Sequence, residues 1–245
     1  MLNRIRRELG LAGTGIADFL DGFENINSWK YDTTPTDLVE WSEQLRWIKG
    51  EKFTFKDRDY LFQIYRDQNK EIRIVKPRQI EITEFALNWL VYHLTKNPFT
   101  VGLYASDRKD HVSKFSGLRL KSQCLNQSPI LKDMTKTGNV GMQPFKNDSI
   151  LYMLSAWDNF ESARSIPVDF AVVDEMQSVN VEALPVLKEA LSKSRFRKIL
   201  EIGTGSDEGD NWYKEWHVVL FMSGIYNKRI GSCDQRLFQE FLHIT

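Results

Sequence analysis

Two adjacent carboxylates, Asp174 and Glu175, follow an apolar segment in the second half of the chain. The segment, residues 168–173, has the near-continuous apolar pattern of a strand buried on both faces of a parallel sheet. Such strands end at the edge where open α/β folds bind their ligands, so both acids are expected there. At that edge an Asp can hold Mg²⁺ through water. A neighbouring acid can act as general base on the water that attacks a terminal phosphate.

The carboxylate pair therefore predicts nucleotide hydrolysis, with Asp174 on the magnesium side and Glu175 as the catalytic base. The alternative is a strand that exits into a solvated loop, where acids are common. The polar turns upstream and downstream of the pair favour the first interpretation, because they follow in the order of a P-loop motor.

The upstream turn has the length of a phosphate-binding loop and lies between a predicted strand and a predicted helix. The standard loop reads Gly-x-x-x-x-Gly-Lys-Ser/Thr. The corresponding residues here are Lys76, Pro77, Arg78, Gln79, Ile80, Glu81, Ile82 and Thr83. Thr83 occupies the position whose hydroxyl binds magnesium. Glu81 replaces the second glycine, and Ile82 replaces the lysine.

Both replacements have physical consequences for phosphate binding. Glu81 adds a Cβ where glycine allows positive φ, and it brings a negative charge toward the phosphates. Ile82 offers no cation. Lys76, at the opposite end of the loop, could reach the same phosphates with its flexible arm, and Arg78 could assist. Two alternatives are an ordinary strand-to-helix turn and a degenerate loop that binds nucleotide weakly or not at all.

The elements that must position these motifs alternate between strand and helix. We predict strands at residues 71–75, 99–104, 150–154, 168–173 and 198–202. We predict helices at residues 57–69, 83–94, 107–124 and 182–193, and a hairpin or edge strands within residues 135–154. This order predicts an α/β fold with a mainly parallel sheet flanked by helices, of the P-loop NTPase (ASCE, RecA-like) type. The domain prediction is a helical extension at 1–50, an ATPase core at 51–210 and a helical or linker segment at 211–245.

The composition is ordinary for a globular protein of 245 residues, with 42% hydrophobic and 27% charged residues. Because 33 basic residues balance 33 acidic ones, any nucleic-acid contact must be local. No apolar run reaches the roughly 20 residues that span a bilayer, and no secretory segment follows the start, so an intracellular protein is expected. Cys124 and Cys233 lack metal-ligand spacing, which predicts two structurally unremarkable thiols.

These motifs together resemble the large terminase subunits that package DNA into tailed-phage heads. The residues from Arg78 to Thr83 resemble the family's Arg-Gln-x-Gly-Lys-Thr loop, and Lys76 matches branches that place the loop lysine first. The downstream turn Gly203, Thr204 and Gly205 resembles the coupling motif that follows the next strand. The resemblance covers roughly residues 55–210, and the departure at Glu81 matches neither loop type.

The resemblance also assigns roles around the nucleotide. Residues 159–169 resemble the stretch where terminases carry an arginine or lysine, which implies Arg164 as an arginine finger. The alternative for Arg164 is an ordinary exposed arginine. The family's adenine-binding element lies around residues 55–63, where Tyr60 and Gln63 are the candidates but no clean match exists.

Two basic clusters could contact a DNA backbone without reading bases. They comprise Arg108, Lys109, Lys114, Arg119 and Lys121, and Lys193, Arg195, Arg197 and Lys198. The alternative for each is a solvated helix face. Trp212, Tyr213 and Trp216 could stack on bases, but a helix that buries its aromatic side explains their spacing equally.

The resemblance implies a motor domain that uses ATP and Mg²⁺ to translocate double-stranded DNA into a capsid, acting in the host cytoplasm. The implied partners are the portal protein and the small terminase subunit, and the implied active form is a homo-oligomeric ring. Nuclease activity is not expected, because the chain ends too soon for the family's nuclease domain. The alternatives are a helicase-like or restriction-type DNA translocase and a decayed, non-hydrolysing P-loop module that binds DNA.

Overall fold

The structure is a computed structural model that describes residues 35–76, 80–156, 163–180, 184–204 and 220–221. The chain divides into two compact units, Met1–Thr36 and Asp37–Thr245, and nearly all described residues belong to the second. Most of the predicted extension at 1–50 and nearly all of the predicted segment at 211–245, including Trp212, Tyr213 and Trp216, lie outside the described residues.

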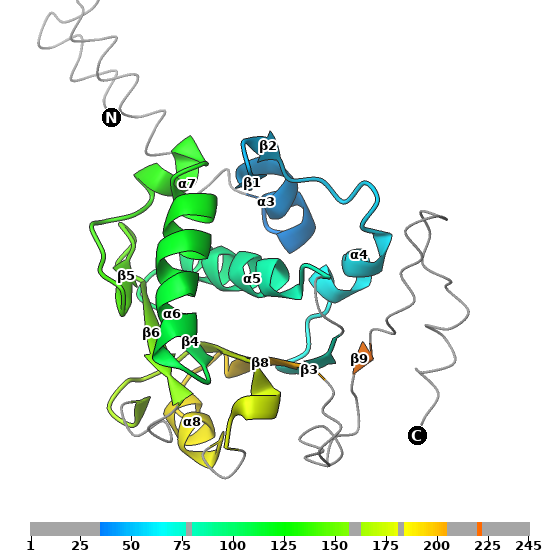
Figure 1. The fold of residues 1–245 in the computed structure, drawn as a ribbon. Helices are drawn as coiled ribbons and strands as arrows, with labels where there is room; N and C mark the ends of the chain where they lie inside the picture. The colour runs from blue at the N-terminus through cyan, green and yellow to red at the C-terminus, as the bar shows by residue number, and fades with distance from the viewer. Residues whose placement is uncertain (1–34, 77–79, 157–162, 181–183, 205–219, 222–245) are drawn as a thin grey trace, which may run out of the picture. The chain divides into compact units, whose positions relative to one another are not determined.

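A seven-stranded sheet lies at the centre of the described part of the second unit (Figure 1). Its strand order is β5-β6-β4-β7-β8-β3-β9. The bounds are β3 (Glu71–Val75), β4 (Val101–Ser106), β5 (Met142–Pro144), β6 (Ile150–Ser155), β7 (Phe170–Asp174), β8 (Lys198–Gly203) and β9 (Leu220–Phe221). Neighbouring strands are parallel except for β5 and β6. The predicted α/β fold with a mainly parallel sheet is therefore confirmed.

The strand order brings two distant motifs to one edge of this sheet. Strand β3, which leads into the phosphate loop, and strand β7, which ends in the carboxylate pair, are separated only by β8. All three strands run in the same direction, so their carboxyl ends share one edge. The chain leaves β3 and returns as β4 on the far side of β7. Ligands of open α/β sheets bind where the chain switches sides in this way.

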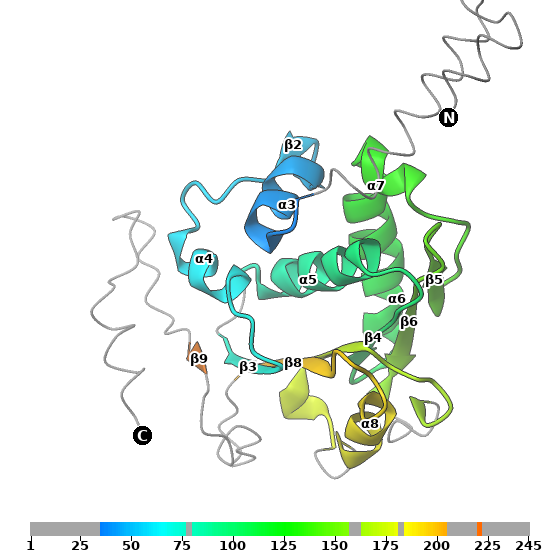
Figure 2. The ribbon, with the colours of Figure 1, turned by 180° about the vertical axis from the view of Figure 1, so that it is seen from behind.

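Helices cover the sheet on both faces. Their bounds are α3 (Leu38–Leu45), α4 (Asp59–Tyr65), α5 (Ile82–Lys96), α6 (Lys109–Lys114), α7 (Pro129–Asp133) and α8 (Leu184–Leu191). A π-helix, η1 (Phe115–Leu125), continues α6, a 3-10 turn, η4 (Met176–Ser178), follows β7, and a short hairpin pairs β1 (Trp47–Ile48) with β2 (Glu51–Lys52). Figures 1 and 2 show α5 on one side of the sheet and α8 on the other.

Strand β7 shows why both faces must be covered. Phe170 and Val172 belong to the core cluster on the α5 side, whereas Ala171 and Val173 belong to the cluster on the α8 side. All four are fully buried. A strand that is buried on both faces needs apolar residues at every position. Its sequence is therefore a continuous apolar run, the pattern from which β7 was predicted.

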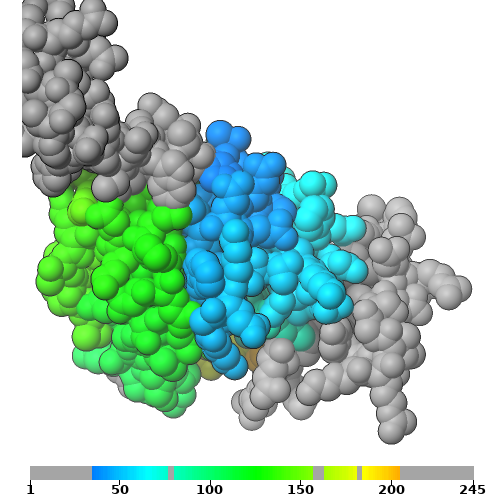
Figure 3. Space-filling model, turned by 90° about the horizontal axis from the view of Figure 1, so that it is seen from above, coloured from blue at the N-terminus to red at the C-terminus, as the bar shows by residue number. Residues whose placement is uncertain are grey.

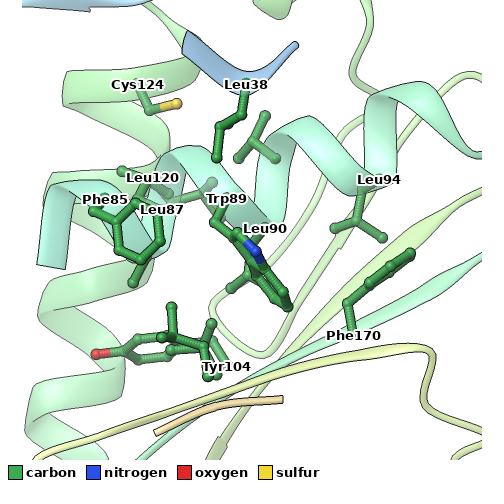
Figure 4. Close-up of a cluster of buried hydrophobic side chains, with 14 of the residues drawn as sticks. Leu38, Phe85, Leu87, Trp89, Leu90, Leu94, Tyr104, Leu120, Cys124 and Phe170 are labelled. Atoms are coloured by element: carbon green, nitrogen blue, oxygen red, sulfur yellow. The ribbon is translucent and has the colours of Figure 1, made fainter. Parts of the chain in front are cut away.

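Helix α5 is the central helix of the core. Its apolar side chains are buried nearly all round, and they lie between the sheet and helices α3 and η1 (Figure 4). On the sheet side they meet Tyr104 and Phe170, and on the other side Leu38 and Cys124. The helix ends at Lys96, because the next residue, Asn97, precedes Pro98, and helical backbone is disfavoured for a residue before proline.

Helix α3 packs directly on this core. Trp41 has no exposed surface, and its ring meets Tyr92 of α5 edge to face at 5.9 Å. Asp37 caps the helix by accepting hydrogen bonds from the backbone of Val39 and Glu40. In the view from above, the blue surface, which includes α3, adjoins the green surface formed by the middle of the chain (Figure 3).

One predicted helix changes its winding. The helix predicted at 107–124 is α6 up to Lys114 and then an 11-residue π-helix, η1. Pi-helical segments are rare and usually much shorter, and no sequence pattern predicted this one. Among the described residues, no helix combines the length and apolar character needed to cross a membrane.

Candidate active site

Asp174, the last residue of β7, is almost completely buried at the carboxyl edge of the sheet, with 3% of its surface exposed. Its Oδ2 accepts hydrogen bonds from the hydroxyls of Tyr104, at 3.2 Å, and Thr83, at 3.4 Å. Its Oδ1 accepts from the backbone N–H of Glu175 at 3.0 Å. The two residues predicted for the magnesium side, Thr83 and Asp174, therefore lie in contact although 91 positions separate them.

The charge of Lys76 influences the Asp174 carboxyl. Burial raises the pKa of the Asp174 carboxyl, the positive charge of Lys76 opposes this, and the negative charge of Glu175 adds to it, so the net pKa is raised. The backbone N–H of Lys76 donates to the carbonyl of Gly203 at 2.9 Å. Lys76, Asp174 and Gly203 thus lie at the same edge, at the ends of neighbouring strands.

Glu175 adopts a left-handed backbone conformation, with φ of 60°. For a residue other than glycine this costs about 1–2 kcal/mol, and such strain is common where a side chain must be aimed. The turn that follows directs its carboxylate toward Gln177, whose Nε2 donates to Glu175 Oε2 at 2.6 Å. The Oε1 of Gln177 accepts from the backbone N–H of Thr204 at 2.9 Å.

Glu81 also has a φ of 60°, so it takes the left-handed conformation for which the standard loop uses glycine. Its carboxylate forms a two-point ion pair with Arg58, with Arg58 Nε 2.5 Å from Oε2 and Nη2 3.3 Å from Oε1. The hydrogen bond to Glu81 raises the pKa of Arg58. The unusual charge in the loop is therefore neutralised by a cation from the segment before α4.

The side chain of Ile82 is buried in the core and is not exposed on the loop. It is 1% exposed and starts α5 within the cluster between this helix and the sheet. Ile80 is partly buried against the same cluster. Pro77, Arg78 and Gln79 lie outside the described residues, and so does Gly205 of the predicted coupling turn.

Arg164 lies at an exposed position between β6 and β7. It lines a cavity of about 320 Å³ together with Pro167 and with Val186 and Glu189 of α8. Neither Asp174 nor Glu175 lines this cavity. Its role as an arginine finger stays a prediction.

The adenine candidates both belong to α4. Tyr60 packs partly buried against the core cluster, and Gln63 is exposed. Arg58 immediately precedes this helix and pairs with Glu81, so the start of α4 adjoins the end of the phosphate loop.

Many described residues of the two basic clusters have partners within the chain. Arg119 pairs with Glu84 at 2.7 Å, Lys114 with Asp110 at 3.3 Å, and Lys121 donates to the carbonyl of Gly138. In the second cluster, Lys198 donates to the carbonyl of Gln68. Contact of these clusters with DNA stays a prediction.

Three site residues were missed by sequence reasoning. Tyr104 contacts Asp174 from the end of β4, and its place at the end of a predicted strand was an available signal. Gln177 follows the carboxylate pair by two residues, and a turn after the strand brings a residue at this spacing back toward the pair. Nothing in the sequence around Arg58 indicated its pairing with Glu81.

Comparisons with known proteins add to this geometry. No family model matches the sequence, and no curated protein matches it. Solved structures do. The large terminase ATPase domain of Thermus phage P74-26 has a TM-score of 0.57 at 20% identity, covering 72% of this chain and 72% of that one. The HK97 bacteriophage large terminase has a TM-score of 0.55 at 14% identity, covering 68% of this chain and 36% of that one.

The fold is that of a large terminase ATPase domain. The match covers 36% of the HK97 protein, so this chain spans only part of that protein's length. Because one fold hosts many functions, the function of this chain must be argued from its site.

Proposed function

We propose that this chain is the ATP-hydrolysing motor domain of a DNA-packaging terminase. The observation that carries the proposal is the contact between the Thr83 hydroxyl and the buried Asp174 carboxylate, with Glu175 next to them. These are the residue types that a P-loop motor uses for its metal and its attacking water. They come from two motifs that the strand order brings to one sheet edge.

The oxygen atoms at this edge suit Mg²⁺ bound with ATP. Magnesium prefers oxygen ligands and keeps several waters, so one hydroxyl and one carboxylate, with phosphate oxygens, are a sufficient donor set. Thr83 and Asp174 would hold it, Asp174 through water. When bound, the ion would neutralise charge on the β- and γ-phosphates.

The remaining roles follow from charge and position. Lys76 supplies the cation that Ile82 cannot, and the loop residues from Pro77 to Glu81 wrap the phosphates, with Arg78 assisting. Glu175 acts as the base that orients the attacking water. Gly203, Thr204 and Gly205 couple the phosphate state to motion.

The terminase fold supports the proposal at the level of partners. We infer that the chain acts on double-stranded DNA, with a portal protein and a small terminase subunit, in the host cytoplasm. The exposed Arg164 would reach the nucleotide of a neighbouring chain in a homo-oligomeric ring. A helicase-like or restriction-type translocase would have the same nucleotide core.

DNA-stimulated ATP hydrolysis tests the proposal. The wild type, assembled with double-stranded DNA and Mg²⁺, should release phosphate, and Glu175→Ala should reduce the rate by about 10²–10⁴-fold, as loss of a general base does. Nucleotide binding by Glu175→Ala should persist. A wild type that releases no phosphate when assembled with DNA contradicts the proposal.

One observation favours a second candidate, a decayed module that binds DNA without hydrolysis. Glu81 and Arg58 satisfy each other without a nucleotide, and Ile82 is committed to the core. In that case, ATP binding should be absent while DNA binding is retained.

A further inference from the structure

A single side-chain amide connects the candidate catalytic base to the neighbouring strand. Gln177 donates from Nε2 to Glu175 Oε2 at 2.6 Å and accepts at Oε1 from the backbone N–H of Thr204 at 2.9 Å. Glu175 follows β7, and Thr204 follows β8. The amide therefore joins the ends of two adjacent parallel strands at the edge that carries the site.

The chemistry of the three groups fixes the orientation of this amide. A backbone N–H can only donate, so the atom of Gln177 that faces Thr204 must be the oxygen. The nitrogen then faces Glu175, where it needs an acceptor, and an ionised carboxylate is one. The bridge thus satisfies the Gln177 amide at both ends.

The local backbone holds Gln177 in this place. The 3-10 turn η4 is closed by hydrogen bonds from Ser178 N to the Glu175 carbonyl, at 2.9 Å, and from Val179 N to the Met176 carbonyl, at 3.2 Å. Met176 has no exposed surface and anchors the turn in the α8-side core. Gln177 itself is only partly buried, so its side chain projects from an anchored turn.

We propose that Gln177 is a positioning residue that orients the Glu175 carboxylate and ties it to the backbone at Thr204. One oxygen of Glu175 is held by the amide, and the other is left to face the attacking water. A displacement of Thr204 at the end of β8 moves the amide and with it the base. The inference rests on the proposed function and extends it by one residue outside the motifs that carried it.

Gln177→Met is the direct test, because it keeps the length of the side chain and removes both hydrogen bonds. If Gln177 positions the base, the kcat for ATP hydrolysis should fall by about 10–100-fold, the usual effect of losing a group that orients a reacting residue. The Kd for Mg-ATP should stay within about twofold, since the interaction lost matters only in the transition state. Ser178→Ala is the matched control, because Ser178 is exposed in the same turn, and it should hydrolyse ATP at the wild-type rate.

A double-mutant cycle separates positioning from a general effect on the turn. In a Glu175→Gln background, Gln177→Met should cause no further fall in kcat, because the group through which it acts is already disabled. An equal fall in both backgrounds would overturn the proposal. A loss of Mg-ATP affinity as large as the loss of rate would overturn it too, by assigning Gln177 to binding.

Gln177→Glu gives a readout that a purely structural role would not produce. A protonated carboxyl can accept from Thr204 and donate to Glu175, whereas an ionised one repels Glu175. The activity of this variant, relative to wild type, should therefore rise as the pH falls. A pH profile parallel to that of the wild type would contradict the proposal.

The outcomes distinguish this inference from the proposed function. A wild type that hydrolyses ATP beside an equally active Gln177→Met overturns only the role of Gln177. A wild type that binds no Mg-ATP contradicts the proposed function, and the role of Gln177 with it.

Discussion

At the scale of single residues, the site is built from groups that are held in unfavourable states. Asp174 is a buried carboxyl with a raised pKa, and Glu175 and Glu81 both have left-handed backbones. A bound metal and phosphate would offset these costs, because they supply charge and hydrogen bonds that the free site lacks. The residues that carry function should therefore reduce the stability of the free protein.

Asp174→Asn should raise the melting temperature at neutral pH. A group whose folded pKa is raised adds stability below its unfolded pKa and loses it as the pH rises through the folded value. Asn cannot ionise, so the variant does not lose this free energy of unfolding. At pH 7 without Mg²⁺ it should therefore melt about 2–4 °C above the wild type, the shift that about 1 kcal/mol causes in a chain of this size. The difference should shrink as the pH falls. Thermal unfolding at pH 7 and pH 5 checks this, and a variant that melts below the wild type at pH 7 would contradict it.

Lys76→Ala should lose Mg-ATP affinity by about 10–100-fold, which corresponds to one charge-assisted hydrogen bond of about 1.5–3 kcal/mol. Lys56→Ala is the matched control, because Lys56 is an exposed lysine before α4. Fluorescence titration with a nucleotide analogue measures both. An unchanged affinity in Lys76→Ala would rule out the early-lysine interpretation.

The Arg58–Glu81 pair allows a rescue experiment. Arg58→Ala leaves the charge of Glu81 uncompensated at the loop, and Mg-ATP affinity should fall about fivefold, as expected for a partly exposed charge about 4 Å away. Glu81→Gly removes both that charge and the left-handed strain, so it should bind more tightly than wild type and make Arg58→Ala harmless. If Arg58→Ala weakens binding equally in both backgrounds, the pair has no electrostatic role.

At the scale of elements, the sequence predicted the strands, which have a periodic pattern of apolar residues. It did not predict features that depend on contacts between distant residues. The strand around Val172 was predicted because burial on both faces requires an apolar run, and the strand at 71–75 because apolar and polar residues alternate along it. The π-helix η1 was missed, because its register is set by contacts that periodicity does not contain. The pairing of Glu81 with Arg58 was missed for the same reason, since 23 positions separate the two.

A buried polar network fixes the first turn of α5, which carries Thr83. Glu84 accepts from Arg46, at the end of α3, at 2.8 Å and from Arg119 of η1 at 2.7 Å. The Arg46 side chain has no exposed surface, and it also donates to Asn88. The end of α3 and helix η1 are thereby tied to the start of the helix that supplies the magnesium-side hydroxyl.

Glu84→Ala should therefore destabilise the fold by about 3–5 kcal/mol, the cost of leaving a buried charge without its partner. Asp110→Ala is the comparison, because it breaks an exposed pair with Lys114 that should contribute nothing measurable. Urea unfolding of both variants checks this. Equal stability of Glu84→Ala and wild type would contradict a structural role for the network.

At the scale of the whole molecule, different observations support the fold and the proposed chemistry. Structures of two phage terminases establish the terminase fold for the described residues. The chemistry depends on whether an altered loop, with Glu81 paired and Ile82 buried, still binds phosphates beside Asp174 and Thr83.

Calorimetric titration of the wild type with ATP, with and without Mg²⁺, measures this directly. We expect one ATP to bind per chain in the presence of Mg²⁺ and binding to weaken strongly when the metal is chelated. Absence of binding under both conditions, or an affinity that does not respond to Mg²⁺, would contradict a nucleotide site formed by the loop and the carboxylate pair.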